Sequence, residues 1–310
     1  MLSHPGVWLA ISRRQTRANS LPTITSYLNG AKAGMPGGNP SPAKRGVVNG
    51  WSSAAVRRHT QWLYSVDALQ LTDEGYAVTL TVRDCPPSAL EFHAARRAYI
   101  KRLTRMGVTR IHWVIEWQRR RVPHMHLAVY FATDAEASAS APTGSKRAAL
   151  VDAWLEVAAA FAPSARSQYV LPITGHTGWS RYLSKHAARG AAHYQRQGKP
   201  PGWEKTGRLW GFTGDWPAMA PMRHVVSREA FWRYRRLVRA WRVADARAAS
   251  DPARIKFARR MLACPLPKLS AVRGTSEWIP EDINAGFLAL LASEGHLMLD
   301  PDVSQVAPSS

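Results

Sequence analysis

The chain of 310 residues has few cysteines, few acidic side chains and no long hydrophobic run. Only Cys85 and Cys264 occur, which excludes a disulfide scaffold and a four-cysteine zinc site and fits a reducing cytoplasm. No apolar stretch approaches the roughly 20 residues that a membrane-spanning helix needs. The first arginines follow a very short apolar stretch, the reverse of a secretory signal, so we expect a soluble intracellular protein.

Acidic residues are half as numerous as basic ones. Asp and Glu total 21 against 42 Lys and Arg, which gives a net charge of +21. This excess predicts a polyanionic partner, and nucleic acid fits best because Lys and Arg contacts to phosphates dominate its binding. The hydrophobic fraction of 45% suffices for a sizeable core and excludes a wholly disordered chain. Charge alone does not separate an enzyme from a protein that merely coats nucleic acid.

Composition divides the chain into four segments. Residues 1–45 are rich in Gly, Pro, Ser and Asn and predict a flexible basic leader. Residues 46–217 have the densest alternation and the clearest turn signals, so we expect the chemistry there. Residues 218–263 predict a basic helical segment, and residues 264–310 an acidic, partly disordered tail.

Hydrophobic periodicity within the second segment predicts alternating strands and helices. Strands are expected at 76–82, 111–117, 124–131 and near 168–173. Helices are expected at 47–67, 86–106, about 146–161 and 177–189. The order from residue 76 is β-α-β-β-α-β-α. It predicts an α+β fold, with a ferredoxin-like (RRM-like) antiparallel sheet and helices packed on one face.

His124 and His126 lie one residue apart in a predicted strand, so both rings project from one face and can bind one ion. If residues 117–123 form a hairpin, Glu116 points to the same face and can supply an oxygen ligand. This set leaves positions open for water and a phosphate oxygen, as a catalytic divalent metal requires. Mixed nitrogen and oxygen ligation suits Mn²⁺ better than Mg²⁺. The alternative is a pair of exposed sheet histidines beside a surface glutamate.

Tyr182, Lys185, His186 and Arg189 recur at helical spacing and predict one polar, basic stripe. Such neighbours can hold a phosphate and favour the phenolate of Tyr182. A tyrosine needs this help because, at its ordinary pKa of about 10, it is a poor nucleophile at neutral pH. The alternative is an ordinary core or surface tyrosine.

In these motifs and their order, the chain resembles the HUH (histidine-hydrophobic-histidine) endonucleases. Within them it is similar to the rolling-circle replication initiators of filamentous phages and plasmids. Their threonine strand is matched by VTLT at 78–81, their histidine motif by His124-Met125-His126, and their Y-x-x-K motif by residues 182–185. Glu116 lies where several members place a carboxylate ligand. Two further stretches resemble the filamentous-phage type, VVNGWSSAAVRRH at 47–59 and GRLWGFTGDW at 207–216.

The resemblance implies a metal-dependent, site-specific DNA endonuclease and strand transferase with a tyrosine nucleophile. Tyr182 would attack a phosphodiester of single-stranded DNA at an origin hairpin, leaving a 5′-phosphotyrosine and a free 3′-hydroxyl. Mg²⁺ or Mn²⁺ held by Glu116, His124 and His126 would polarise the phosphate. Lys185 would help to orient or neutralise that phosphate.

Many of these relatives carry a second tyrosine one helical turn further on, where this chain has His186. We therefore expect a single nucleophile, with Tyr194 or a tyrosine of a second subunit as a less favoured helper. No Walker-type phosphate-binding motif is present, so unwinding is expected to need a host helicase and extension a host polymerase, in the cytoplasm of a bacterial host. The expected DNA contacts are Thr79, Thr81, Arg119, Arg120, Arg121, His186 and Arg189.

Three alternatives stay open from the sequence. A conjugative relaxase usually places its tyrosine before a three-histidine cluster, whereas Tyr182 follows the histidines. A transposase of the same superfamily is typically shorter and lacks such flanking segments. A non-enzymatic single-stranded nucleic-acid-binding protein would read bases through exposed aromatic residues, whereas the predicted faces carry His, Glu and Thr.

Overall fold

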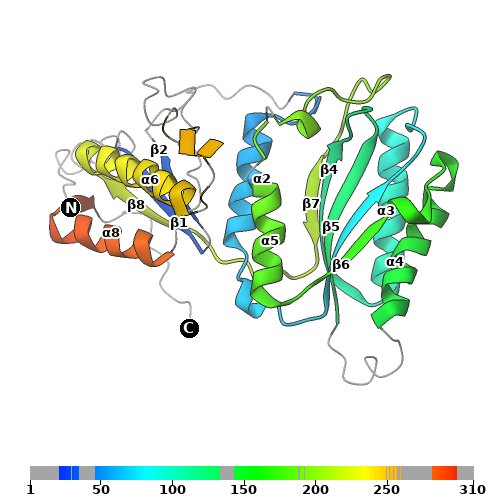
Figure 1. Ribbon diagram of the computed structural model, residues 1–310, viewed down its shortest axis with the longest axis horizontal. Coiled ribbons are helices and arrows are strands. Elements are labelled where there is room, and N and C mark those ends of the chain that lie inside the picture. Colours follow the sequence, from blue (N-terminus) through cyan, green and yellow to red (C-terminus); the bar gives the residue numbers. More distant parts are fainter. Residues whose placement is uncertain are drawn as a thin grey trace, which may run out of the picture. The chain divides into compact units, whose positions relative to one another are not determined.

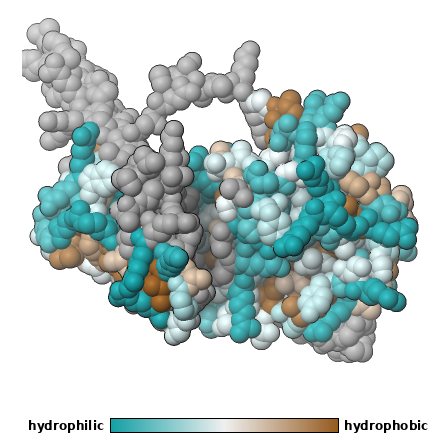
Figure 2. Space-filling model, turned by 45° about the horizontal axis from the view of Figure 1, so that its top comes forward, coloured by the Kyte–Doolittle hydropathy of each residue, from teal (hydrophilic) through white to brown (hydrophobic). Residues whose placement is uncertain are grey.

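The computed structural model describes residues 21–28, 30–34, 46–132, 143–187, 189–191, 193–248 and 281–298, with 250, 252, 253, 255, 256 and 259. The chain forms two compact units, Ala43–Ala218 and a second that joins Met1–Pro42 to Met219–Ser310 (Figure 1). The face seen in Figure 2 is mainly hydrophilic, with hydrophobic residues in small separate patches. Among the described residues, no helix combines the length and apolarity needed to cross a bilayer.

The unit of residues 43–218 is built on a five-stranded antiparallel sheet in the order β6-β3-β5-β4-β7. Helix α3 (Ala89–Arg105) connects β3 to β4, and α4 (Thr143–Val157) lies between β5 and β6 in the chain. The α+β fold class predicted from the sequence is confirmed. The strands are β3 (Gly75–Thr81), β4 (Val108–Trp117), β5 (Pro123–Phe131), β6 (Tyr169–Ile173) and β7 (Trp210–Thr213).

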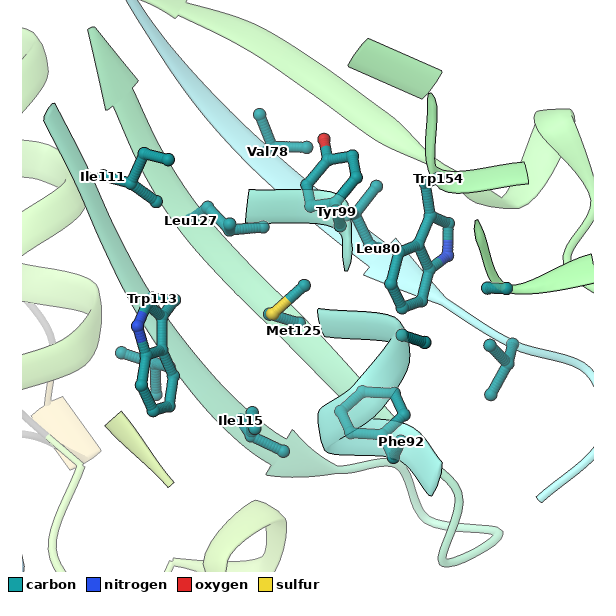
Figure 3. Packing of buried hydrophobic residues seen from close by; sticks show 14 of the residues in the cluster. Val78, Leu80, Phe92, Tyr99, Ile111, Trp113, Ile115, Met125, Leu127 and Trp154 are labelled. Carbon is teal, nitrogen blue, oxygen red and sulfur yellow. The ribbon is translucent and has the colours of Figure 1, made fainter. Parts of the chain in front are cut away.

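One face of this sheet packs its hydrophobic side chains against α3 and α4 (Figures 1 and 3). The alternation of β3, β4 and β5 sends every second residue into this core, as the sequence predicts. Helix α3 begins after Ser88, whose hydroxyl accepts a hydrogen bond from the Glu91 amide and so caps the helix. The residues of this core labelled in Figure 3 are Val78, Leu80, Phe92, Tyr99, Ile111, Trp113, Ile115, Met125, Leu127 and Trp154.

The other face of the sheet is also covered, by α2 (Ser53–Ser65) and α5 (Gly175–Ala187), which lie side by side (Figure 1). The prediction that helices pack on one face only was therefore wrong. Its physical reason is visible in β4, because His112, Val114 and Glu116 on this second face are each 0% exposed. The valine and alanine side chains on this face are buried by packing against another element even though histidine and glutamate lie beside them, and α2 and α5 supply that packing.

The second unit contains a four-stranded antiparallel sheet in the order β2-β1-β8-β9, with α6 (Arg228–Ala248) and α8 (Glu281–Ser293). Ile24 of β1 is buried with Phe231 and Tyr234 of α6 and Leu291 of α8. Segments predicted as separate, from both ends of the chain, thus share one core. The strands are β1 (Thr23–Tyr27), β2 (Gly30–Gly34), β8 (Met222–Val226) and β9 (Leu297–Met298).

The expected flexible leader of residues 1–45 was wrong for residues 23–34, which form β1 and β2. The sequence TITSY alternates in burial, and Thr23 pairs with both Gly34 and Val225 across the two neighbouring strands. Apart from Lys32, β2 consists of Gly and Ala and has no hydrophobic alternation, so its pairing partner rather than its own sequence holds it extended. Residues 1–20 and 35–45 of this predicted leader lie outside the described residues.

Candidate active site

Strands β4 and β5 bring Glu116, His124 and His126 onto one face of the sheet. The predicted hairpin between them is present: the Gln118 amide donates to the Val122 carbonyl at 2.9 Å, and Arg121 turns the chain with a φ of 60°. The antiparallel register then sets Glu116 directly opposite His124. Because the strand alternation has a period of two, His126 shares that face.

The three side chains are close enough to hold one ion. Their ligand atoms all lie within 4.8 Å of one another. His124 Nε2 is 2.9 Å from His126 Nε2, and His126 Nε2 is 3.6 Å from Glu116 Oε2. Thr79 Oγ1 lies 2.9 Å from His126 Nδ1, which fixes the ring with its Nε2 toward the cluster. All three are buried, so they are not the exposed residues of the alternative interpretation.

Burial keeps both histidines neutral. It lowers the pKa of His124 to about 3, and the nearby charges of Arg189 and Lys185 act in the same direction. The pKa of His126 is likewise well below its ordinary value, chiefly through burial. A neutral imidazole has a free lone pair, which is the form that binds a metal. Two neutral imidazoles and a carboxylate therefore fit a divalent cation.

Glu116 is already paired with two arginines. Arg196 Nε lies 3.0 Å from Glu116 Oε1, and Arg189 donates to Oε2. Arg196 is itself buried, stacks 4.2 Å over the Trp51 ring, and donates to the His186 carbonyl at 3.1 Å. Sequence reasoning expected Arg189 to contact DNA and gave Arg196 no role. No local signal could have found Arg196, which meets Glu116 across 80 positions of the chain.

Tyr182 lies inside the unit rather than on an exposed basic stripe. It is 6% exposed, its ring stacks on Trp179, and its hydroxyl is 2.9 Å from His112 Nδ1. Burial raises the pKa of Tyr182 well above its ordinary value, so the surroundings do not favour the phenolate as the sequence had suggested. The stripe interpretation failed because α5 covers the second face of the sheet, which turns Tyr182 and His186 inward.

His112 connects Tyr182 to a second histidine. Its Nε2 is 3.0 Å from His59 Nε2, and its ring stacks on Trp62. Burial lowers the pKa of His112 to about 3, so it is neutral. Sequence reasoning placed His112 on the same face as Glu116 but gave it no function. The signal was present, because positions 112, 114 and 116 share one face of a strand.

His186 lies between Tyr182 and the candidate metal-binding cluster. Its ring centroid is 4.6 Å from that of Tyr182 and 5.0 Å from that of His126. The side chain is fully buried, and neither ring nitrogen has a hydrogen-bond partner among the described residues. Unpartnered buried nitrogens are costly, and here they mark a polar cluster that a bound group can complete.

A pocket of about 530 Å³ opens beside this cluster. Its lining includes Thr79, His126, Tyr182, Lys185 and His186. Burial, followed by the charge of Arg189, lowers the pKa of Lys185 from its ordinary value. The structure thus brings the predicted nucleophile, the predicted lysine and one predicted metal ligand to a single pocket.

The remaining predicted DNA contacts lie elsewhere. Thr81 is buried and accepts a hydrogen bond from Gln118. The hairpin arginines 119–121 are exposed, but none lines this pocket. Arg120 donates to the Val82 and Arg83 carbonyls, which ties the hairpin to the end of β3. Tyr194 is 54% exposed with Arg119 above its ring, and it does not line the pocket.

Comparison with known proteins gives three long matches. The chain is 43% identical over 267 residues to the replication-associated protein of Pseudomonas phage Pf3, covering 85% of this chain and 93% of that protein. It is 45% identical over 287 residues to a provisionally named replication protein of Xylella fastidiosa strain 9a5c, covering 89% and 98%. A second such protein, from strain Temecula1, is 45% identical over 269 residues, covering 83% and 99%. No protein-family model and no solved structure matches the chain.

Proposed function

The chain belongs to the family of phage and bacterial replication proteins that includes the Pf3 replication-associated protein, and we propose that it initiates rolling-circle replication by nicking one DNA strand. The nucleophile in this proposal is Tyr182. The observation that carries it is the single pocket lined by Tyr182, Lys185 and His126, next to the cluster of Glu116 and His124. The alternative, a protein that only binds single-stranded nucleic acid, does not require a tyrosine and a lysine beside a metal-binding cluster.

The fold supports the same assignment. Strands β6-β3-β5-β4 have the order of a ferredoxin-like sheet, with α3 and α4 as its two crossing helices and β7 added at the edge. The histidine pair lies on a central strand and the tyrosine on a helix that covers it. This arrangement is what we expect of an HUH endonuclease, so we propose that class for the domain.

The reaction is a transesterification. The Tyr182 oxygen bonds to the phosphorus, and the bond from phosphorus to the 3′-oxygen of the preceding nucleotide breaks. The products are a 5′-phosphotyrosine and a free 3′-hydroxyl, whose oxygen takes its proton from water. Mg²⁺ or Mn²⁺ bound by Glu116, His124 and His126 would polarise the phosphate and stabilise its charge. Lys185, which lines the pocket, would supply a second positive charge to the phosphate.

The proton of Tyr182 needs an acceptor because burial keeps the phenol protonated at neutral pH. His112 Nδ1 is the partner of the hydroxyl. If His112 carries its proton on Nε2 and donates to His59, then Nδ1 is free to accept from Tyr182. If His112 Nδ1 instead donated to the Tyr182 hydroxyl, the Tyr182 proton would have no acceptor among the described residues. As the Tyr182 oxygen bonds to phosphorus, that oxygen becomes less basic, and His112 takes its proton.

The proposal is tested by trapping the covalent intermediate. The full chain is incubated with Mn²⁺ and a labelled single strand that carries the origin sequence, and a denaturing gel resolves the adduct. We expect Tyr182→Phe to abolish the adduct and retain DNA binding, and Tyr194→Phe, at an exposed position, to form it normally. Mass spectrometry should locate the nucleotide on Tyr182. An adduct formed by Tyr182→Phe, or on another residue, overturns the assignment.

A further inference from the structure

A second pocket lies at the β7 edge of the same sheet. It has a volume of about 410 Å³ and is lined by α3, β4, β7 and the residues just before β7. The active-site pocket lies at the opposite edge, where β3 and β6 line it. The charged residues that line the pocket at the β7 edge are all basic: Arg96, Arg97, Lys101 and Arg208.

Arg96 is the centre of this pocket. Its guanidinium carbon lies 3.8 Å from the centroid of the Trp113 ring, so the ring and the planar cation stack. Two of its nitrogens, Nε and Nη1, are shielded from solvent and have no hydrogen-bond partner among the described residues. Burial, and then the charges of Arg97 and Arg208, lower the pKa of Arg96 to about 10. The fold therefore holds a partly desolvated cation beside like charges.

No ion pair in the described part of the chain offsets these four charges. Unpaired buried guanidinium groups and clustered like charges are both unfavourable, and a bound anion removes both penalties. Guanidinium groups match the oxygens of a phosphate because they can donate two parallel hydrogen bonds. The lining thus suits an oxyanion, and the oxyanion that DNA offers is its phosphate.

An aromatic surface adjoins the cations. Phe212 of β7 lines the pocket and is 45% exposed, which is unusual for a phenylalanine. One side of its ring stacks on Trp62 of α2, with 4.5 Å between the ring centroids, so the ring lies at the β7 edge on the face that α2 covers. An exposed ring at the same edge of the sheet as these cations can stack an unpaired base. Bases in a duplex are already stacked on one another, so this surface favours a single strand.

We infer that this pocket binds a phosphodiester and an adjoining base of single-stranded DNA, at a position distinct from the strand-cutting site. This inference depends on the proposed function in one respect, namely that the ligand is DNA. The scissile phosphate would lie at Glu116, His124 and His126, on the face of the sheet that α2 and α5 cover, whereas Arg96 stacks on Trp113 on the face that α3 and α4 cover, so the contact falls outside the immediate neighbourhood of the scissile phosphate. The pocket would hold the strand on one side of the nick.

The test compares two double variants of the full chain. Arg97→Ala/Arg208→Ala removes two exposed cations of the pocket, and Arg105→Ala/Arg166→Ala removes two exposed cations outside it. Affinity for a labelled 20-nucleotide single strand is measured by fluorescence anisotropy over a range of salt. Each phosphate contact to a single strand contributes about 0.7 to the slope of log K against log salt, so the pocket variant should lose about 1.4. We expect its affinity near 0.1 M salt to fall about tenfold.

Further arms separate the possible outcomes. Phe212→Ala should weaken single-strand binding about tenfold and leave duplex binding unchanged. If Phe212→Ala loses affinity equally for duplex and single strand, the base-stacking assignment is overturned. If the two double variants show equal salt slopes, the proposal that this pocket binds DNA is overturned. Inorganic phosphate that competes as well as DNA indicates a small-anion site and also overturns it. Adduct formation on an oligonucleotide of a few nucleotides should be normal in all these variants, so failure of this inference is distinguishable from failure of Tyr182.

Discussion

At the residue scale, the hydrogen bond between Tyr182 and His112 determines where the proton of the proposed nucleophile can go. We expect His112→Asn to slow adduct formation by about 10²-fold, the lower end of the usual contribution of a general base, because burial lowers the pKa of His112 to about 3. Single-turnover rates measured over a range of pH give the effect. His59→Asn should slow the reaction less, because His59 positions His112 and does not touch the phenol.

Two controls separate this role from a structural one. His176→Asn, at an exposed position on the same helix as Tyr182, should leave the rate unchanged. Mn²⁺ binding by His112→Asn, followed by electron paramagnetic resonance, should match the unsubstituted protein if the fold is intact. A normal rate in His112→Asn with intact metal binding would show that the proton leaves by another route.

Arg189 competes with the proposed metal for the same carboxylate oxygen. Because Arg189 and Arg196 together bring two positive charges to one carboxylate, a divalent cation meets repulsion as it binds. We expect Arg189→Ala to tighten Mn²⁺ binding about tenfold, a difference of about 1.4 kcal/mol. Isothermal titration calorimetry on the full chain measures it. Arg166→Ala removes an exposed charge that does not line the active-site pocket and should change the affinity little. Weaker binding in Arg189→Ala would mean that this arginine holds Glu116 in place for the metal.

At the element scale, strand β7 packs against β4 at glycines where a side chain would clash with β4. Gly214, directly after β7, has a φ of 86°, and a Cβ there would lie 1.9 Å from the Thr109 carbonyl oxygen. We expect Gly214→Ala to destabilise the protein by at least about 2 kcal/mol, since both the backbone strain and the clash oppose it. Urea denaturation provides the measurement. Gly46→Ala, where a Cβ meets nothing within 4 Å, should change the free energy of unfolding little. Equal stability of the two variants would show that β7 can shift without cost.

Local periodicity predicted β3, β4 and β5 because each has one strongly hydrophobic face, whereas the short β7 was not predicted as a strand. It also predicted that Glu116 and His124 would share a face, since a tight hairpin fixes the register. It failed where distant segments meet. Neither the cover of α2 and α5 over His112, nor the pairing of Arg196 with Glu116, follows from spacing along the chain. These contacts depend on tertiary packing, which reverses the expected exposure of Tyr182 and His186.

At the scale of the whole molecule, the proposed chemistry lies in one continuous stretch while the second unit is assembled from both ends of the chain. Glu116, His124, His126, Tyr182 and His112 all belong to residues 43–218. In the second unit, the Asn284 side chain donates to Ser26 at 3.1 Å and accepts from Tyr234 at 2.7 Å. The N-terminal strands are thus a structural part of a unit whose helices come from the C-terminal third of the sequence.

Removing the N-terminal strands should therefore destabilise that second unit selectively. Deletion of residues 1–34 takes away Ile24 and the partner of β8, and leaves Phe231 and Val226 without cover on one side. We expect trypsin to cut within α6, which is rich in arginine, at least about tenfold faster, since cleavage follows the population of the open state. Deletion of residues 1–20 keeps β1 and β2 and should leave the rate unchanged. Adduct formation on a short oligonucleotide should survive both deletions, because the site lies in the other unit. Equal digestion rates for the two truncated chains would mean that β8 and α6 hold together without β1.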